Sequence, residues 1–389
     1  MHRARAEGDE LLRLLAERPL TEQTFALTQE LLESDEHSWA QQVSMGSIRN
    51  AAVIEHLTQH AHDLLGDRPR WSVVLMQLAL RFVETLRQPE ISLNRSMKLE
   101  ADANKEYASA LLECSEIREA LKAVERADTF YDLLPFELSH RPQALLQLIK
   151  GRLLHKSGRS GEGLIMIEQA TNFLKGFCRD DEKYITGKTI YGYILYEIGR
   201  YRDALFAFEM AAEAAEHRQD GIALAYILDN VGLCAVKLTP PDYEKAEQCF
   251  TFALQRFEEA GLAAEVMRVR QGRIMAMVAS GQYNEALMQC YANRSEALKL
   301  GLPIFAAFVS VRIAEIQIQS GRAASVRALL RESLETLSKA GLHLEARRAL
   351  SYLYEIGSER PVTLGDVHYV RQFVDRLSND DALVFTRPA

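Results

Sequence analysis

Residues 192–211 read GYILYEIGRYRDALFAFEMA, and this stretch decides the fold class of the chain. Gly199 separates two apolar runs, and both runs alternate small and bulky side chains at helical spacing. Small residues let two helices approach closely, and bulky residues fill the groove beside them. The stretch therefore predicts two antiparallel helices joined by a tight turn at Gly199.

The same punctuation recurs along the chain, which indicates a repeat protein. Turn glycines stand at Gly158, Gly199, Gly281 and Gly321, and Thr239-Pro240-Pro241 takes this place in one unit. A second set, each 40 residues after the one before, follows the second helix of each pair: Gly221, Gly261, Gly301 and Gly341. We interpret this set as helix C-cap residues in the left-handed conformation. A fixed period of this size is typical of a solenoid in which each unit buries its face against its neighbours.

The pattern resembles the tetratricopeptide repeat family. That family's order of small residue, leucine, turn glycine, tyrosine, alanine, phenylalanine and alanine is met by Gly192, Leu195, Gly199, Tyr201, Ala204, Phe208 and Ala211. Other units depart from it, because Gly163, Ile274 and Asn293 stand where smaller or different residues are usual. The resemblance implies an all-α fold, a right-handed superhelical solenoid of antiparallel helix pairs. Its period exceeds the family's usual one, which implies longer helices.

The pattern divides the chain into four expected parts. Residues 1–95 form an N-terminal helical region, which is a cap, a set of degenerate repeats or a small bundle. Residues 96–345 form the repeat array, residues 346–378 form C-terminal capping helices, and residues 379–389 form a tail. A helix-turn-helix in residues 21–50 is disfavoured, because Arg49 is the one cation it offers to phosphates.

Composition favours a cytoplasmic protein. The 389 residues are 48% hydrophobic and carry a net charge of −8, which argues against a nucleic-acid or membrane-surface partner. The chain offers neither the apolar core of a signal peptide near Met1 nor a run of about 18 apolar residues that could cross a membrane. Its five cysteines lie far apart, so we expect buried, reduced thiols.

Two motifs suggest chemistry, and neither is complete. Thr186–Thr189 read TGKT, as at the end of a phosphate-binding loop, but the required earlier glycine is Lys183 and no strand precedes it. His56, His60 and Asp63 have the spacing of metal ligands on one helix face, but they also border an apolar stripe and fit its solvated edge. We therefore expect no catalytic residue, no metal, no cofactor and no enzymatic activity.

The family resemblance also implies where a partner would bind. In such repeats the first helix of each pair lines the concave surface, so exposed residues there face a common groove. Arginine suits carboxylates, and tyrosine gives contact area at low entropy cost. The predicted groove residues are Arg152, His155, Tyr193, Tyr196, Asp229, Asn230, Arg268, Gln271 and Arg312.

Some family members clamp the terminal carboxylate of a peptide. Asn230 and Arg268 fall on clamp-like positions, but Thr189, Tyr193 and Gly272 stand at the neighbouring ones, so this function is not supported. The main hypothesis is a non-enzymatic scaffold or regulatory module that binds a peptide or helix of a partner protein. The alternative is a signal-responsive regulator of bacterial type, whose solenoid closes on a small or peptide ligand and changes partner binding through the N-terminal region.

Overall fold

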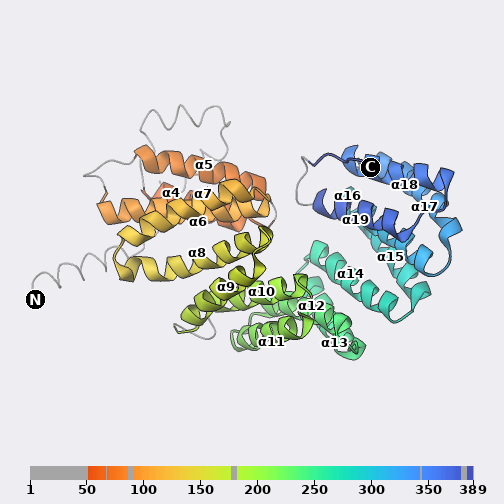
Figure 1. Ribbon diagram of the computed structural model, residues 1–389, viewed down its shortest axis with the longest axis horizontal. Helices are drawn as coiled ribbons and strands as arrows, with labels where there is room; N and C mark the ends of the chain where they lie inside the picture. The colour runs from red at the N-terminus through yellow and green to blue at the C-terminus, as the bar shows by residue number, and fades with distance from the viewer. Residues whose placement is uncertain are drawn as a thin grey trace, which may run out of the picture. The chain divides into compact units, whose positions relative to one another are not determined.

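The computed structural model describes residues 51–66, 68–85, 91–176, 182–341, 344–377 and 383–388 (Figure 1). Every regular element in these ranges is a helix, which confirms the all-α class. The chain forms two compact units, residues 1–177 and 178–389, which are described separately. The residues considered for a helix-turn-helix, 21–50, lie outside the described part.

The first unit contains six described helices, joined by short connections. α6 packs on both α4 and α5, and the three share a core that includes Leu57, Met76 and Leu99. Residues 51–85 of the expected N-terminal helical region thus form two helices, which pack against the next helix. The helices are α4 (Ala51–Asp63), α5 (Pro69–Thr85), α6 (Leu93–Glu113), α7 (Ile117–Leu133), α8 (Phe136–Lys156) and α9 (Ser160–Lys175).

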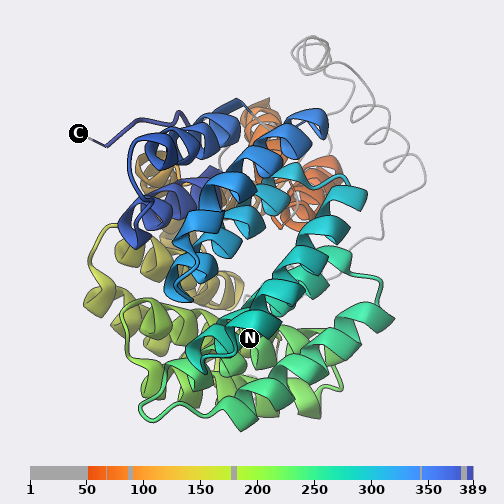
Figure 2. The ribbon, with the colours of Figure 1, turned by 90° about the vertical axis from the view of Figure 1, so that its right-hand side faces the viewer.

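The second unit continues the same pairing, and its helices follow one another from green to dark blue in Figure 2. The first helices of successive pairs, such as α12 and α14, also contact each other. The elements are α10 (Glu182–Glu197), α11 (Tyr201–His217), α12 (Gly221–Lys237), α13 (Tyr243–Glu259), α14 (Ala263–Ala279), α15 (Tyr283–Lys299), α16 (Pro303–Gln319), the 3-10 turn η1 (Ala323–Ser325), α17 (Val326–Lys339), α18 (Leu344–Glu359) and α19 (Leu364–Leu377).

The turn glycines adopt the predicted left-handed conformation. Gly199 has a φ of 81°, and the N–H of the next residue, Arg200, returns to the carbonyl of Leu195 at 2.8 Å. This backbone bond caps the end of the first helix of the pair, and the second helix begins at Tyr201. The turns at residues 158, 281 and 321 have φ values of 83°, 80° and 77°.

The interpretation of Gly221 as a C-cap is wrong. Gly261, Gly301 and Gly341 have φ values of 69°, 70° and 81°, but Gly221 is the first residue of α12. Gln219 takes the left-handed position instead, with a φ of 57°. The longer loop before α13 adds two residues to this repeat, so the real spacing from residue 219 to 261 is 42. The even spacing in the sequence therefore hid one irregular repeat.

Glycines on the first helices make room for phenylalanines on the second. A Cβ added at Gly192 would lie 2.9 Å from Phe208, and one added at Gly232 would lie 2.7 Å from Phe250. Gly272 on α14 faces Phe250 as well, and a Cβ added there would lie 3.0 Å from its ring. Phe250 is fully buried between two helix backbones, which confirms the predicted alternation of small and bulky residues.

The last helix packs back on the array. Val367, Val370 and Val374 of α19 are buried in one core with residues of α16. Arg371 of α19 donates to Glu315 of α16 at 2.8 Å. Within the described ranges, no helix has both the length and the apolarity needed to cross a bilayer.

The cysteines in the described ranges are buried free thiols, as expected. Burial raises the pKa of Cys234 and Cys290 to about 12. A thiol with so high a pKa carries almost no thiolate at neutral pH and is a poor nucleophile. These cysteines therefore act as small core residues.

Candidate functional site

The strongest candidate site lies where α12 and α14 run side by side in the second unit. Asp229 of α12 forms an ion pair with Arg268 of α14. Arg268 also donates from Nε to Glu265 at 2.7 Å, and its guanidinium group lies 5.5 Å from the ring centroid of Tyr226. One arginine thus links two neighbouring first helices and covers an aromatic ring.

Burial governs the charges of this cluster. The side chain of Asp229 is only 2% exposed, and this burial raises its pKa even though Arg268 acts to lower it. Burial acts to lower the pKa of Arg268, but Asp229 and Glu265 outweigh it and the pKa rises. Burial also raises the pKa of Tyr196 on α10 to about 12, and Asp229 adds a smaller contribution. Tyr196 thus belongs to the same electrostatic neighbourhood.

Several buried polar atoms of this cluster have no hydrogen-bond partner among the described residues. They are Oδ1 of Asp229, Nη2 of Arg268, and both Nε2 and Oε1 of Gln271. Gln271 is 7% exposed, so its whole amide group is buried and unused. Leaving a buried polar atom unpaired costs about 1–3 kcal/mol. Ordered water or a ligand is the usual partner of such atoms, and further unpaired atoms of this kind occur at Asn293, Arg312 and Gln317.

Four of the nine predicted groove residues, Asp229, Asn230, Arg268 and Gln271, lie on α12 and α14, and of these Asp229 and Arg268 form an ion pair. Asn230 donates to the carbonyl of Tyr226 at 2.8 Å. Tyr196 contacts the ring of Tyr201, with centroids 5.3 Å apart, and Tyr193 lies exposed one turn before it on α10. Asp229 and Gln271 were expected to be exposed, but the neighbouring helices bury them.

The remaining predicted residues lie elsewhere. Arg312 of α16 is 11% exposed, pairs with Glu315 and lies under α19, whose Arg371 binds the same carboxylate. Arg152 and His155 belong to the first unit. Arg152 forms an ion pair with Glu113 at 2.6 Å, and His155 hydrogen-bonds with Ser160.

The sequence prediction missed Tyr226 and Glu265. Tyr226 precedes Asp229 by three residues, so helical periodicity alone places the two on one face. Its ring is 38% exposed and also contacts Phe257, with centroids 4.8 Å apart. Glu265 precedes Arg268 by three residues and could have been found by the same argument.

Neither the TGKT stretch nor the histidine and aspartate set forms the site that its sequence pattern suggests. Thr186–Thr189 lie inside α10, where the backbone amides serve the helix and Thr189 Oγ1 donates to Ile185 O at 2.9 Å. His56, His60 and Asp63 lie on or at the end of α4. In the described ranges, no cluster of three or more His, Cys, Asp or Glu side chains could hold a metal ion.

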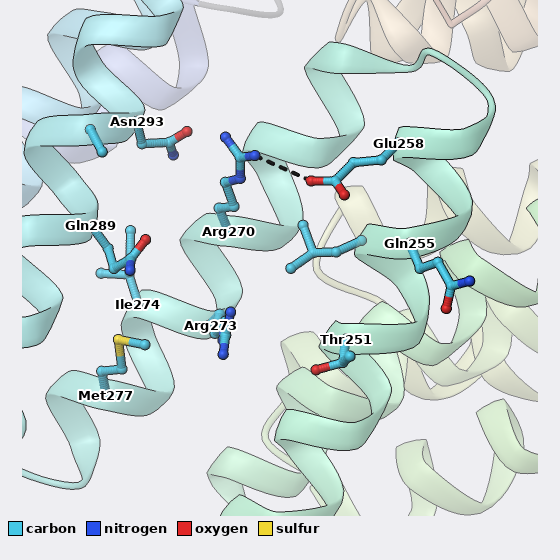
Figure 3. A pocket seen from close by; sticks show the side chains of 11 residues that line it. Thr251, Gln255, Glu258, Arg270, Arg273, Ile274, Met277, Gln289 and Asn293 are labelled. Atoms are coloured by element: carbon cyan, nitrogen blue, oxygen red, sulfur yellow. Dashed lines mark hydrogen bonds and ion pairs between the residues drawn. The ribbon is translucent and has the colours of Figure 1, made fainter.

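A hollow lies beside α14, between α13 and α15 (Figure 3). Its volume is about 610 Å³, and Arg270 and Arg273 project into it from α14. Glu258 and Glu296 neutralise Arg270 from either side, and Glu247 binds Arg273. Because these exposed carboxylates already serve both cations, we treat this hollow as secondary.

Comparison with known proteins adds evidence for the fold. No family model matches the chain, and no curated protein matches it. Solved structures do match. The fold is similar to that of the Rap proteins.

Two of these structures have TM-scores above 0.5. Aspartyl phosphate phosphatase F from Bacillus subtilis has a TM-score of 0.53 at 13% identity, covering 90% of this chain and 95% of its own. The apo form of RapI has a TM-score of 0.51 at 14% identity, covering 72% and 97%. A Rap protein complexed with Competence and Sporulation Factor has a TM-score of 0.48 at 12% identity, covering 84% and 99%. At these identities the likeness concerns the fold, and it agrees with the helical repeats predicted from the sequence.

Proposed function

We propose that the chain is a cytoplasmic, non-enzymatic regulatory module of the tetratricopeptide repeat type, which binds an extended peptide segment of a partner protein. The proposed site, called the α12–α14 surface below, consists of Tyr196, Tyr226, Asp229, Arg268 and Gln271. The observation that carries the proposal is the buried amide of Gln271, which uses neither its donor nor its acceptor within the described part of the chain.

A peptide reaches these buried atoms only after the side chains that cover them move aside, and the atoms then match the bonding pattern of an extended backbone. A glutamine amide can donate to a peptide carbonyl and accept from a peptide N–H at the same time. Asp229 Oδ1 supplies another acceptor, and Arg268 Nη2 another donor. The rings of Tyr196 and Tyr226 add contact area beside these groups. Main-chain bonds of this kind give affinity for a peptide with little dependence on its side chains.

The charges of the surface favour some segments over others. Asp229 and Glu265 face the single cation Arg268, so one negative charge is in excess. A strongly acidic segment would therefore be repelled, and a neutral or basic one would fit better.

The experiment is a selection of random peptides on the full chain, followed by affinity measurement with the Gln271→Ala variant. We expect the selected peptides to bind Q271A at least tenfold more weakly, because the backbone bonds of one amide are lost. Gln289→Ala on α15 is the matched control and should leave the affinity unchanged. If the wild type and Q271A bound every selected peptide with equal affinity, the α12–α14 surface would not be the peptide-binding site.

The second candidate is a ligand-responsive regulator, whose solenoid closes on its ligand and acts through the N-terminal region. The likeness to aspartyl phosphate phosphatase F supports it, because 90% coverage of this chain is more than residues 96–345 alone can supply. The phosphatase activity in that protein's name is an activity of that protein and is not proposed for this chain. A peptide from the selection should then reduce the radius of gyration of the full chain in solution scattering, whereas a simple scaffold would keep its radius.

A further inference from the structure

Residues 383–388 lie extended against α18 and α19, and an aromatic cluster holds their central side chain. The ring of Phe385 has its centroid 5.0 Å from that of Phe373, 5.7 Å from that of Tyr352 and 6.0 Å from that of Tyr369. Tyr352 belongs to α18, and the other two belong to α19. Phe385 thus occupies a pocket made by both helices.

The main chain of the segment is held as well. The backbone N–H of Phe385 donates to Glu345 Oε2 at 2.7 Å, and the hydroxyl of Tyr369 donates to the carbonyl of Thr386 at 2.6 Å. Glu345 is itself buried and also binds Arg348. A buried carboxylate that accepts a backbone N–H positions an extended chain without reading its side chain.

A second side chain of the segment, that of Arg387, also contacts α18. Arg387 donates to Glu355 at 2.6 Å, and its guanidinium group lies 6.0 Å from the ring centroid of Tyr352. Val384 is 64% exposed, so it adds little to the fit. Pockets for alternate side chains, combined with main-chain bonds, are the usual way in which proteins recognise extended peptides.

The segment leaves part of its groove unfilled. A hollow of about 440 Å³ runs beside it along α18, with Phe385 and Arg387 on one wall and Leu344, Arg347 and Ser351 on the other. This hollow is open to solvent, so the segment lies beside free surface of α18 that a longer or bulkier peptide could also cover.

We propose that the surface formed by Glu345, Tyr352, Glu355, Tyr369 and Phe373, the α18–α19 surface, is a second peptide-binding site. Its partner is a protein segment that carries phenylalanine and arginine with one residue between them. Residues 383–388 of the chain itself hold the site until such a partner displaces them. This inference is independent of the α12–α14 surface, which lies on other helices.

The test uses a fluorescent peptide with the sequence of residues 381–389, DALVFTRPA, and full-length variants of the chain. In the wild type the tethered segment competes at an effective concentration on the order of 1 mM, so the peptide binds weakly. Phe385→Ala in the chain removes this competitor, and the peptide should then bind at least tenfold more tightly. Val384→Ala in the chain is the matched control and should behave as the wild type does.

Sequence specificity is measured on the peptide. Replacing its phenylalanine or its arginine by alanine should weaken binding to the F385A chain at least tenfold. A peptide that keeps only these two residues in a glycine and serine background should still compete, and a scrambled peptide should not. Should F385A unfold at the assay temperature, Arg387→Glu in the chain weakens the hold on the tethered segment without removing the ring of Phe385.

Three results would overturn the proposal. The first is the absence of peptide binding to a folded F385A or R387E chain. The second is equal binding of the scrambled peptide. The third is a concentration-dependent dimer of the wild type that disappears in F385A, because this would show that the site takes the segment of a second copy.

Discussion

Replacing Gln271 by leucine should stabilise the protein and at the same time weaken the peptide binding proposed for the α12–α14 surface. The two unpaired amide atoms of Gln271 each cost about 1–3 kcal/mol in the folded state. Leucine has a similar volume and no polar atom, and the change of side-chain shape takes back about 1 kcal/mol. We therefore expect the free energy of unfolding to rise by about 1–5 kcal/mol.

The assay is urea unfolding of the full chain, with thermal unfolding beside it. For a unit of this size a gain of about 1 kcal/mol corresponds to about 2–4 °C in Tm. Gln289→Leu on α15 is the control, because the amide of Gln289 already donates to Glu285, and its effect should be smaller. A loss of stability in Gln271→Leu, or unchanged affinity for the selected peptides, would refute the reasoning that the amide is kept for a ligand.

Three further outcomes are expected. Phe250→Ala should cost about 3–5 kcal/mol in urea unfolding, because the ring lies between two helix backbones, whereas Ala at the exposed Phe206 should change stability by less than about 0.5 kcal/mol. Gly261→Ala should lower the free energy of unfolding by about 1 kcal/mol or more, because the φ of Gly261 is 69°. Gly221→Ala, at the start of α12, should leave the stability unchanged or raise it. Equal losses of stability in the two variants would mean that Gly221 is a C-cap after all. Hydrogen bonds from Arg360 and Thr363 lower the pKa of Asp366 from 3.8 to about 2, so the contribution of its carboxylate to stability is complete above about pH 4 and is lost as the pH falls through 2. The difference in Tm between the wild type and Asp366→Asn, measured from pH 7 to pH 2, should therefore shrink between pH 4 and pH 2. A difference in Tm that stays constant over this range would contradict the assignment.

Helix pairing could be predicted because each pair is encoded locally. The sequence signals are a turn glycine such as Gly199 and a small residue that faces a bulky one such as Phe208. Both depend on contacts between residues that lie close together in the sequence. The C-cap at Gln219 could not be predicted, because a non-glycine residue can adopt a positive φ when the surrounding helices fix the backbone. Spacing alone then assigned the cap to the nearest glycine, Gly221.

The candidate site could be predicted in part for a related reason. The helix and the face that carry Asp229 and Gln271 follow from periodicity, so both residues were found. Their burial depends on how closely α12 and α14 approach, and this is decided by Gly272 and Phe250 on other faces. Arg312 shows the same limit, because its exposure depends on α19, which comes from more than 50 residues further along the chain.

Exposed ion pairs cross the seam between α13, α14 and α15 in the second unit. Across this seam Arg270 bridges Glu258 and Glu296, whose side chains are largely open to solvent. Mobile ions screen such pairs, while the apolar seam at Phe250 is indifferent to them. Rising ionic strength should therefore weaken this interface, and with it the neighbouring interfaces that exposed pairs such as Lys245–Glu209 and Arg294–Glu332 bridge.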